Sequence, residues 1–567
     1  MKKGFLLFWG LCLLAQWGMA QAPKWMEKAK RSVFSVVTYG QDDKILNTGN
    51  GFFVTEDGIA LSDYSLFKDA KRAVIVNYEG EQMPVEAIMG ADDMYDVVKF
   101  KVAITGKKVP ALSVVAASPA VGTDVYLLPY STRKDRSYTA GKVKAVDKVA
   151  DNNNYYTLDM HLTDKMVSCP LVTADGLAFG MVQKSSGQDT ATVCYAVDVR
   201  FAAAQSISAL SYNDMTLRTI GIKKALPDTE EQALVFLLMA SSQISADRYA
   251  ALLDDFVAQF PNSSEGYIRR ASNRLAMSIE EPSMELVSED LDKALEVSSK
   301  KDDAYYNRAK LIYAYMLGEP KTVYKDWSFD KALEEIRKAI EMEPLPIYLQ
   351  LEGDICYAKQ DYASALTSYE KVNQTNLASP ATFFNTAKTK EMMKAPAEEV
   401  LALMDSCIAR CPQPYTEIAA PYLLERAQAR MNADQARAAL QDYDAYYQVA
   451  NGKVNDLFYY YREQAALKAK QYQRALDDMA KAIELNPKDL TYRAELAVVN
   501  MRVGRNEEAL NVLNKALEID PGYAEGYRLV GIAYLQLKKK NEACKNFQKA
   551  KELGDPNVDA LIEKHCK

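Results

Sequence analysis

The chain has 567 residues, of which 49% are apolar and 26% are charged, values that are ordinary for a globular protein. This length predicts about three to four units of domain size. The formal net charge is −7, and the lysines are scattered, which argues against a role in binding nucleic acid. After the N-terminal segment, no stretch approaches the roughly 20 consecutive apolar residues that a membrane-spanning helix needs.

The first 20 residues have the pattern of a cleaved export signal. Lys2 and Lys3 form a basic start, an apolar stretch runs to Leu14, and the segment ends in the small residue Ala20. A membrane anchor is the alternative, but the apolar run is short and Gln16 interrupts it. We therefore expect residues 1–20 to be a signal peptide and the mature protein to be periplasmic or secreted.

Residues 21–215 carry the signals of an all-β domain. Short runs rich in β-branched and aromatic residues, such as 33–38 and 73–76, alternate with turn residues such as 56–58. Many short strands at this spacing predict a closed or sandwiched all-β unit.

Two segments of this domain resemble trypsin-like serine proteases of the bacterial HtrA/Deg kind. Residues 49–67 read GNGFFVTEDGIALSDYSLF, and residues 164–176 read DKMVSCPLVTADG. The family has motifs of the form GSGF, DG, LTNxHVV and GNSGGPLVxxDG at these places. The resemblance implies the trypsin-like fold, an all-β double barrel of two six-stranded barrels.

The resemblance also assigns the three slots of the catalytic triad. Ser65 occupies the slot of the histidine base, Asp96 that of the aspartate, and Val167 that of the serine nucleophile. Acyl transfer needs a nucleophilic hydroxyl, an imidazole beside it and a carboxylate that orients the imidazole. Ser168 and Cys169 replace the two glycines that follow the nucleophile in the family. The motifs around the site are retained while the base and the nucleophile are replaced. This predicts a pseudoprotease, which binds a peptide and does not hydrolyse it.

Other residues offer little replacement for the missing groups. Ser65 or Ser168 with Lys165 would make a serine and lysine arrangement, which is the alternative of a serine-type endopeptidase with a non-standard site. His161 lies six residues before the nucleophile slot, where the family has no base. The chain has no Cys-x-x-Cys motif and no histidine cluster, so we expect no metal and no cofactor.

The cysteines suggest two disulfides, because export permits them. Cys544 and Cys566 fall on neighbouring C-terminal helices. Cys169 and Cys194 fall on segments that should be adjacent strands in the trypsin-like fold. The alternative for each cysteine is a buried free thiol.

From residue 230 onward the apolar pattern becomes helical and repeats. The repeat unit has two alanines followed by a proline, successive units are 34 residues apart, and this is the length of the tetratricopeptide repeat (TPR). The clearest positions are Ala475, Ala482, Pro487, Ala509, Ala516, Pro521, Ala543 and Ala550. We expect a linker over 216–229, an all-α TPR solenoid of about eight to nine helical hairpins over 230–555, and a C-terminal capping helix over 556–567.

The concave face of such a solenoid is its usual working surface, and the first helix of each repeat lines it. Such grooves bind an extended peptide or a helix of a partner protein. Aromatic and cationic groups at the inner positions would suit an acidic or C-terminal peptide, although ordinary solvated side chains are the simpler explanation. The candidates are Tyr460, Gln464, Lys468, Arg502 and Arg528.

The sequence therefore predicts a protein–protein interaction scaffold in the bacterial cell envelope. The whole arrangement resembles exported proteins of the Bacteroidetes group, which join a trypsin-like domain to TPRs. The TPR groove would bind one partner protein, and the inactive trypsin-like domain would bind a peptide or a second partner. The alternatives are an active peptidase and a purely structural component of an envelope assembly.

Overall fold

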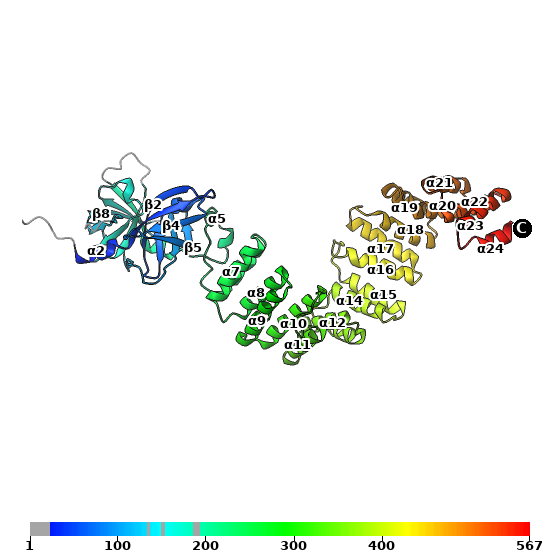
Figure 1. Ribbon diagram of the computed structural model, residues 1–567, viewed down its shortest axis with the longest axis horizontal. Coiled ribbons are helices and arrows are strands. Elements are labelled where there is room, and N and C mark those ends of the chain that lie inside the picture. The colour runs from blue at the N-terminus through cyan, green and yellow to red at the C-terminus, as the bar shows by residue number, and fades with distance from the viewer. Residues whose placement is uncertain (1–22, 133–136, 149–152, 185–192, 567) are drawn as a thin grey trace, which may run out of the picture. The chain divides into compact units, whose positions relative to one another are not determined.

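The computed structural model describes residues 23–132, 137–148, 153–184 and 193–566 (Figure 1). It consists of two compact units, Met1–Ser298 and Ser299–Lys567. The signal peptide expected over residues 1–20 lies outside the described residues. None of the helices within these ranges has the length and the apolar character needed to cross a membrane.

The first unit begins with a closed six-stranded barrel in the order β1-β2-β3-β6-β5-β4. Its core contains the rings of Phe34, Phe53 and Phe100, with 4.7 Å between the centroids of the first two. Alternate residues of a strand point to opposite faces, so β-branched and aromatic residues at every second position fill the interior. The strands are β1 (Val33–Tyr39), β2 (Ile45–Phe53), β3 (Ile59–Ser62), β4 (Arg72–Val76), β5 (Gln82–Asp92) and β6 (Val97–Val102).

A second closed barrel follows in the order β10-β11-β12-β9-β8-β7. The N-terminal helix α2 (Lys24–Lys30) packs on it through the buried Met26, and the Trp25 ring lies 6.3 Å from that of Tyr126. The strands are β7 (Asp124–Leu127), β8 (Thr139–Lys148), β9 (Asn154–Asp159), β10 (Pro170–Thr173), β11 (Ala178–Val182) and β12 (Val193–Asp198). Two barrels followed by a helical array confirm the predicted fold class.

The strand order of the second barrel contradicts the proposed bridge between Cys169 and Cys194. Cys169 directly precedes β10 and Cys194 lies in β12, but β11 runs between these two strands. Both residues are buried free thiols. The prediction was wrong because it placed the two segments side by side in the sheet.

The segment 216–229, expected to be a linker, is packed against the first barrel. Its apolar side chains belong to the same core as Phe34 and Phe100, and that core also includes Phe236 and Phe256 from the first helical hairpin. The backbone of Ile88 in β5 exchanges hydrogen bonds with this segment, at 2.8 Å to the oxygen of Lys223 and 2.8 Å from the nitrogen of Ala225. The buried residues of the segment are Leu217, Ile220, Ile222 and Leu226.

The rest of the first unit is helical. Short helices α4 (Val199–Ala204) and α5 (Met215–Arg218) lead from the barrels to α6. The Thr229 side chain caps α6 by accepting from the backbone nitrogen of Gln232. The two hairpins of this unit are α6 (Glu230–Ser241) with α7 (Ala246–Gln259), and α8 (Ser264–Met277) with α9 (Glu281–Val297).

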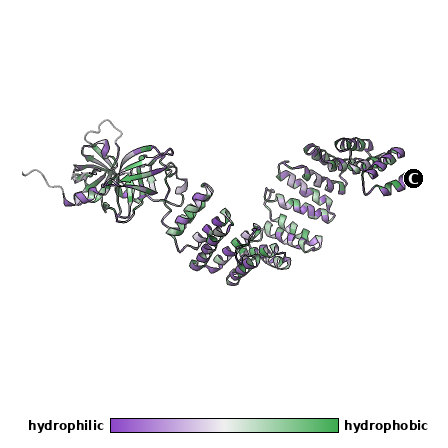
Figure 2. Cartoon of the chain, viewed as in Figure 1, coloured by the Kyte–Doolittle hydropathy of each residue, from purple (hydrophilic) through white to green (hydrophobic). Residues whose placement is uncertain are grey.

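The second unit consists of further helical hairpins. Together with the two of the first unit, consecutive helices pair into nine hairpins over the described residues 230–552. Figure 2 shows hydrophobic and hydrophilic residues side by side on these helices. The helices are α10 (Lys301–Leu317), α11 (Phe329–Met342), α12 (Pro346–Ala358), α13 (Tyr362–Asn373), α14 (Pro380–Met392), α15 (Ala397–Ala409), α16 (Ala420–Asn432), α17 (Ala436–Val449), α18 (Asp456–Lys468), α19 (Tyr472–Leu485), α20 (Leu490–Arg502), α21 (Asn506–Ile519), α22 (Ala524–Gln536), α23 (Lys540–Glu552) and α24 (Asp559–His565).

Small residues at the repeating positions let the two helices of a hairpin approach closely. Ala475 and Ala482 are fully buried. A Cβ atom added to Gly531 in α22 would lie 2.4 Å from the ring of Phe547 in α23. At the C-terminus, a disulfide joins Cys544 of α23 to Cys566, which directly follows α24.

A buried aspartate shared by two arginines recurs in the solenoid. Asp442 of α17 accepts from Arg426 Nη2 at 2.6 Å and from Arg430 Nη1 at 2.8 Å, both from α16. Arg426 also donates to Asp405 of α15 at 2.9 Å, so the cluster ties one hairpin to the preceding one. Asp290 of α9 is shared in the same way by Arg270 and Arg274 of α8, whereas Asp478 of α19 is bound by Arg462 alone. Desolvated charges of this kind are stable only when each has its partners.

We predict that Asp442→Ala opens the α16–α17 hairpin, because it removes the buried anion of two largely buried guanidinium groups and leaves them only the exposed Asp405 as a partner. Removing one partner of a buried ion pair costs about 3–5 kcal/mol. The amides of α16 and α17 should then exchange hydrogen much faster in a deuterium-exchange experiment.

The control for this prediction is Glu484→Ala, which removes an exposed carboxylate that pairs with Lys481 on the surface of α19. Exposed pairs contribute about 1 kcal/mol or less. Equal exchange rates in the two variants would contradict a structural role for the shared aspartate.

Candidate functional site

The first two triad slots lie next to each other in the structure. Ser65 lies in the one-turn helix α3 (Tyr64–Phe67), and Asp96 lies in the turn between β5 and β6 with a φ of 48°. The backbone nitrogen of Ser65 donates to Asp96 Oδ1 at 2.6 Å, and Ser65 Oγ donates to Oδ2 at 3.0 Å. Both carboxylate oxygens of Asp96 therefore accept from Ser65, and no imidazole stands between them.

The third slot is held close to the first barrel. Val167 follows the 3₁₀ turn η2 (Asp164–Met166), and its carbonyl oxygen accepts from Asn50 Nδ2 of β2 at 2.8 Å. The same amide donates to the carbonyl oxygen of Lys165 at 3.0 Å. The valine side chain has neither a lone pair nor an acidic proton, so this position supplies no nucleophile.

A buried carboxyl group lies between these slots, and sequence reasoning did not single it out. Asp63 is 3% exposed, and its Oδ1 has no hydrogen-bond partner among the described residues. Burial, followed by the negative charge of Asp96, raises the pKa of Asp63 to about 8 against the opposing effect of the Ser168 hydroxyl. The only sequence signal was an aspartate at the end of an apolar strand, which is also an ordinary helix-capping position.

The alternative serine and lysine pair is not assembled. Ser168 is 1% exposed and has a φ of 62°, whereas Lys165 is exposed. Within the described ranges, no hydrogen bond joins Lys165 Nζ to Ser65 or Ser168. His161 is exposed just beyond the end of β9. The part of the chain that the structure describes contains no group of three or more metal-ligating side chains.

The five candidates of the solenoid lie on the first helices of three consecutive hairpins. Tyr460, Gln464 and Lys468 belong to α18, Arg502 ends α20, and Arg528 belongs to α22. The structure brings the α18 and α20 surfaces together, because the Tyr460 ring lies 5.8 Å from that of Tyr492.

Carboxylates already neutralise most of the cations in this set. Arg528 pairs with Asp555 at 3.0 Å and with Glu525 at 2.7 Å, and Lys468 lies 3.4 Å from Asp434. Arg502 is exposed at the end of α20. The surface therefore offers an acidic peptide less free positive charge than the sequence suggested.

A buried glutamate in the same region also escaped sequence reasoning. Glu463 is fully buried, and its Oε2 accepts from Gln464 Nε2 at 2.7 Å. Burial and the neighbouring charge of Glu495 raise the pKa of Glu463 to about 8. The sequence did contain a signal that position 463 is buried. Ala497 and Gly531 occupy the equivalent positions in the next two repeats, and both are small residues of the kind that pack between helices.

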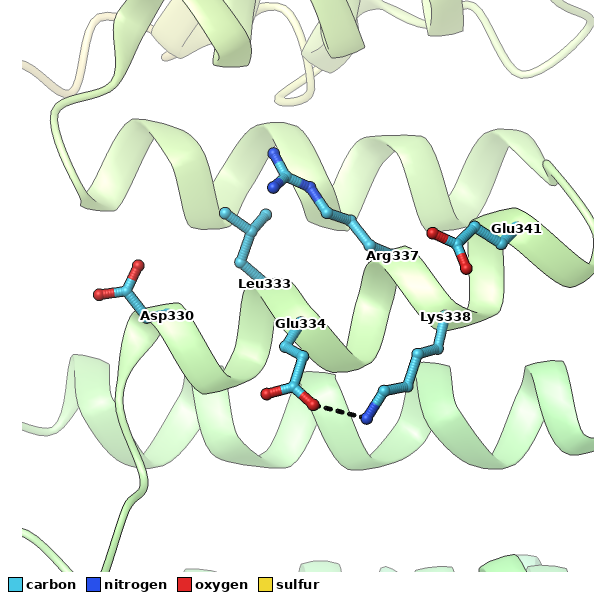
Figure 3. Close-up of a pocket in the computed structure, with 6 residues that line it drawn as sticks. All are labelled: Asp330, Leu333, Glu334, Arg337, Lys338 and Glu341. Atoms are coloured by element: carbon cyan, nitrogen blue, oxygen red, sulfur yellow. Dashed lines mark hydrogen bonds and ion pairs between the residues drawn. The ribbon is translucent and has the colours of Figure 1, made fainter.

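A shallow hollow of about 430 Å³ lies on α11 in the second unit, and Figure 3 shows the residues that line it. Of its charged groups, all but Glu341 bind one another or a neighbour among the described residues: Glu334 pairs with Lys338 at 2.6 Å, Arg337 pairs with Glu352 of α12 at 3.1 Å, and Asp330 pairs with Lys359. A surface whose charges are already paired has little to offer a charged ligand.

We predict that Asp63→Asn changes how stability depends on pH. Between about pH 4 and pH 8 the unfolded chain has lost the Asp63 proton and the folded chain keeps it, so the free energy of unfolding falls as the pH rises. Asparagine has no proton to lose. The free energy of unfolding of the variant, taken relative to that of the wild type, should therefore rise by at least about 1 kcal/mol between pH 5 and pH 8. Scanning calorimetry at the two pH values measures this difference.

Asp93→Asn is the matched control, because this exposed carboxyl lies in the same turn as Asp96. It should melt with the pH dependence of the wild type. If Asp63→Asn does so too, the carboxyl of Asp63 is ionised in the folded protein and our account of it is wrong.

Comparisons with known proteins agree with both halves of the fold. Residues 49–181 match the family model of the trypsin-like peptidase domain, and residues 466–533 match that of the tetratricopeptide repeat. The first match covers the slots of Ser65, Asp96 and Val167.

The curated relatives resemble only part of the chain. TPR repeat-containing protein MJ1428 of Methanocaldococcus jannaschii is 24% identical over 240 residues, which is 40% of this chain and 38% of that protein. DnaJ homolog subfamily C member 7 of Homo sapiens is 33% identical over 94 residues, or 17% of this chain and 19% of that protein. Heat shock protein STI1 of Saccharomyces cerevisiae is 35% identical over 104 residues, or 18% of each chain.

The matches thus span well under half the length of each of these relatives. They support a protein-interaction role for the helical array, and they do not assign a partner. The chain combines a trypsin-like peptidase domain with a solenoid of tetratricopeptide repeats.

Proposed function

We propose that this protein is a non-catalytic interaction scaffold of the bacterial cell envelope. The TPR solenoid binds a partner protein, and the trypsin-like domain binds a peptide or a second partner. The observation that carries the proposal is the content of the triad slots, where Ser65 satisfies both oxygens of Asp96 and Val167 replaces the nucleophile.

The chemistry of acyl transfer supports a non-catalytic trypsin-like domain. A serine hydroxyl is a poor nucleophile unless a base removes its proton. The base slot holds the hydroxyl of Ser65, which donates to Asp96, in place of an imidazole. The nucleophile slot holds the aliphatic side chain of Val167. The barrels do not depend on these groups, because buried aromatic and aliphatic side chains fill both cores.

The repeats support the scaffold role. Helical hairpins that stack through small residues create a long surface whose side chains can vary without disturbing the packing. The nine hairpins described over residues 230–552 offer far more surface than the short segments that match the curated relatives.

Two features support an exported protein. The first 20 residues have the pattern of a cleaved signal. The disulfide between Cys544 and Cys566 suits the oxidising compartments outside the cytoplasm, where such bonds persist.

Lack of peptidase chemistry predicts that a fluorophosphonate probe, which labels activated serine hydroxyls, leaves the mature chain unlabelled. Labelling is read by mass spectrometry beside trypsin as a positive control. Ser65→Ala and Ser168→Ala serve as comparison variants. A label that is present in the wild type and absent from one of these variants would establish the alternative of a serine-type endopeptidase.

The scaffold role predicts one dominant partner when the full mature chain is purified from its own envelope. The partner should be recovered in near-equal molar amount, quantified by mass spectrometry. A broad mixture of unfolded polypeptides would contradict the scaffold and favour binding of many clients. Recovery of the chain alone would contradict the proposed function as a whole.

A further inference from the structure

A second hollow of the second unit lies between the first helices of two successive hairpins. Its volume is about 320 Å³, and the residues that line it come from α10 and α12. It lies outside the segment that matches the TPR family model and away from the five residues that the sequence singled out. A hollow of this size is at the lower limit for small-molecule sites, about 300 Å³, and it suits a few side chains of a peptide.

Much of this hollow is apolar and open to solvent. Leu317, at the end of α10, is 54% exposed, and Ile347, in the first turn of α12, is 43% exposed. The half-buried rings of Tyr306 and Tyr313 line the same hollow. Burial raises the pKa of Tyr313 to about 12, so its hydroxyl stays neutral and can donate a hydrogen bond. Aromatic rings beside exposed aliphatic groups are the usual anchors of a protein interface.

One positive charge in the hollow has no anion. Lys310 of α10 is exposed and lies near the ring of Tyr306, 6.0 Å from its centroid. Among the described residues, no carboxylate lies within ion-pair distance of its ammonium group. This differs from the hollow on α11, where Lys338 pairs with Glu334.

The single carboxylate that lines the hollow is already engaged. Asp354 Oδ1 accepts from Gln350 Nε2 at 2.9 Å and from Tyr369 OH at 2.8 Å. Burial raises the pKa of Asp354. These bonds fix the Gln350 amide with its Oε1 buried and without a donor in the described part of the chain.

We propose that the α10–α12 hollow binds a segment of a partner protein in which apolar side chains flank an aspartate or a glutamate. The apolar side chains cover Leu317 and Ile347, and the carboxylate pairs with Lys310. The inference rests on the proposed scaffold function and specifies what the solenoid recognises.

The test uses a random dodecapeptide library displayed on phage and selected against the full mature chain. The enriched peptides should share an acidic residue between apolar ones. The affinity of one such synthetic peptide is then measured by fluorescence anisotropy. Ile347→Asp should weaken binding more than about tenfold, because it puts a like charge and a polar group into the apolar contact. Leu485→Asp, at a 53% exposed leucine at the end of α19, is the matched control and should bind as the wild type does.

A charge exchange keeps the test independent of folding. Lys310→Glu should lower the affinity for the acidic peptide about tenfold and raise that for the same peptide with lysine in place of its acidic residue. Unchanged affinities in Ile347→Asp, no charge preference in Lys310→Glu, or no enriched peptide would each overturn the inference. If the dominant partner is still recovered from the envelope in any of these cases, the scaffold function stands and only the hollow is wrong.

Discussion

The solenoid depends on buried ion pairs in which a carboxylate needs its arginine partners. Asp442 lies among packed helices, where an ionised carboxylate is tolerated only because Arg426 and Arg430 both bind it. Arg426 also donates to Asp405 in the preceding hairpin, so this contact ties the α16–α17 hairpin to the one before it. Since a single hairpin cannot bury its own apolar face, such links help to set the spacing of the first helices. That spacing decides which side chains meet on the surface that a partner would contact.

Much of the fold could be predicted from the sequence because its signals are local. Alanines 34 residues apart and short apolar runs between turn residues are visible without any contact information. The shared aspartates were not visible. Arg426 and Asp442 are 16 residues apart on different helices, and before the helices are paired such residues look like ordinary solvated charges. The order of β10, β11 and β12 was likewise a property of the closed barrel, which is why the bridge between Cys169 and Cys194 was misjudged.

In the candidate site, too, some residues could be predicted from the sequence and others could not. The resemblance aligned Ser65 and Asp96 by motif, and these two residues are in contact. It gave no warning of Asp63, whose unusual protonation comes from burial and from the charge of Asp96, which follows 33 residues later. Glu463 is a second case, since its neighbour Glu495 belongs to the next repeat. The residue type is read from sequence, but the environment that changes its chemistry is built by distant segments.

The first hairpin of the solenoid is also part of the trypsin-like half. Phe236 of α6 and Phe256 of α7 lie in one core with Phe34 and Phe100 of the first barrel, and residues 216–229 close that core. Segments that share a core lose their packing together. The first barrel and the α6–α7 hairpin should therefore unfold in one cooperative transition. A chain cut near residue 215 would expose apolar surface on both fragments and make them prone to aggregate.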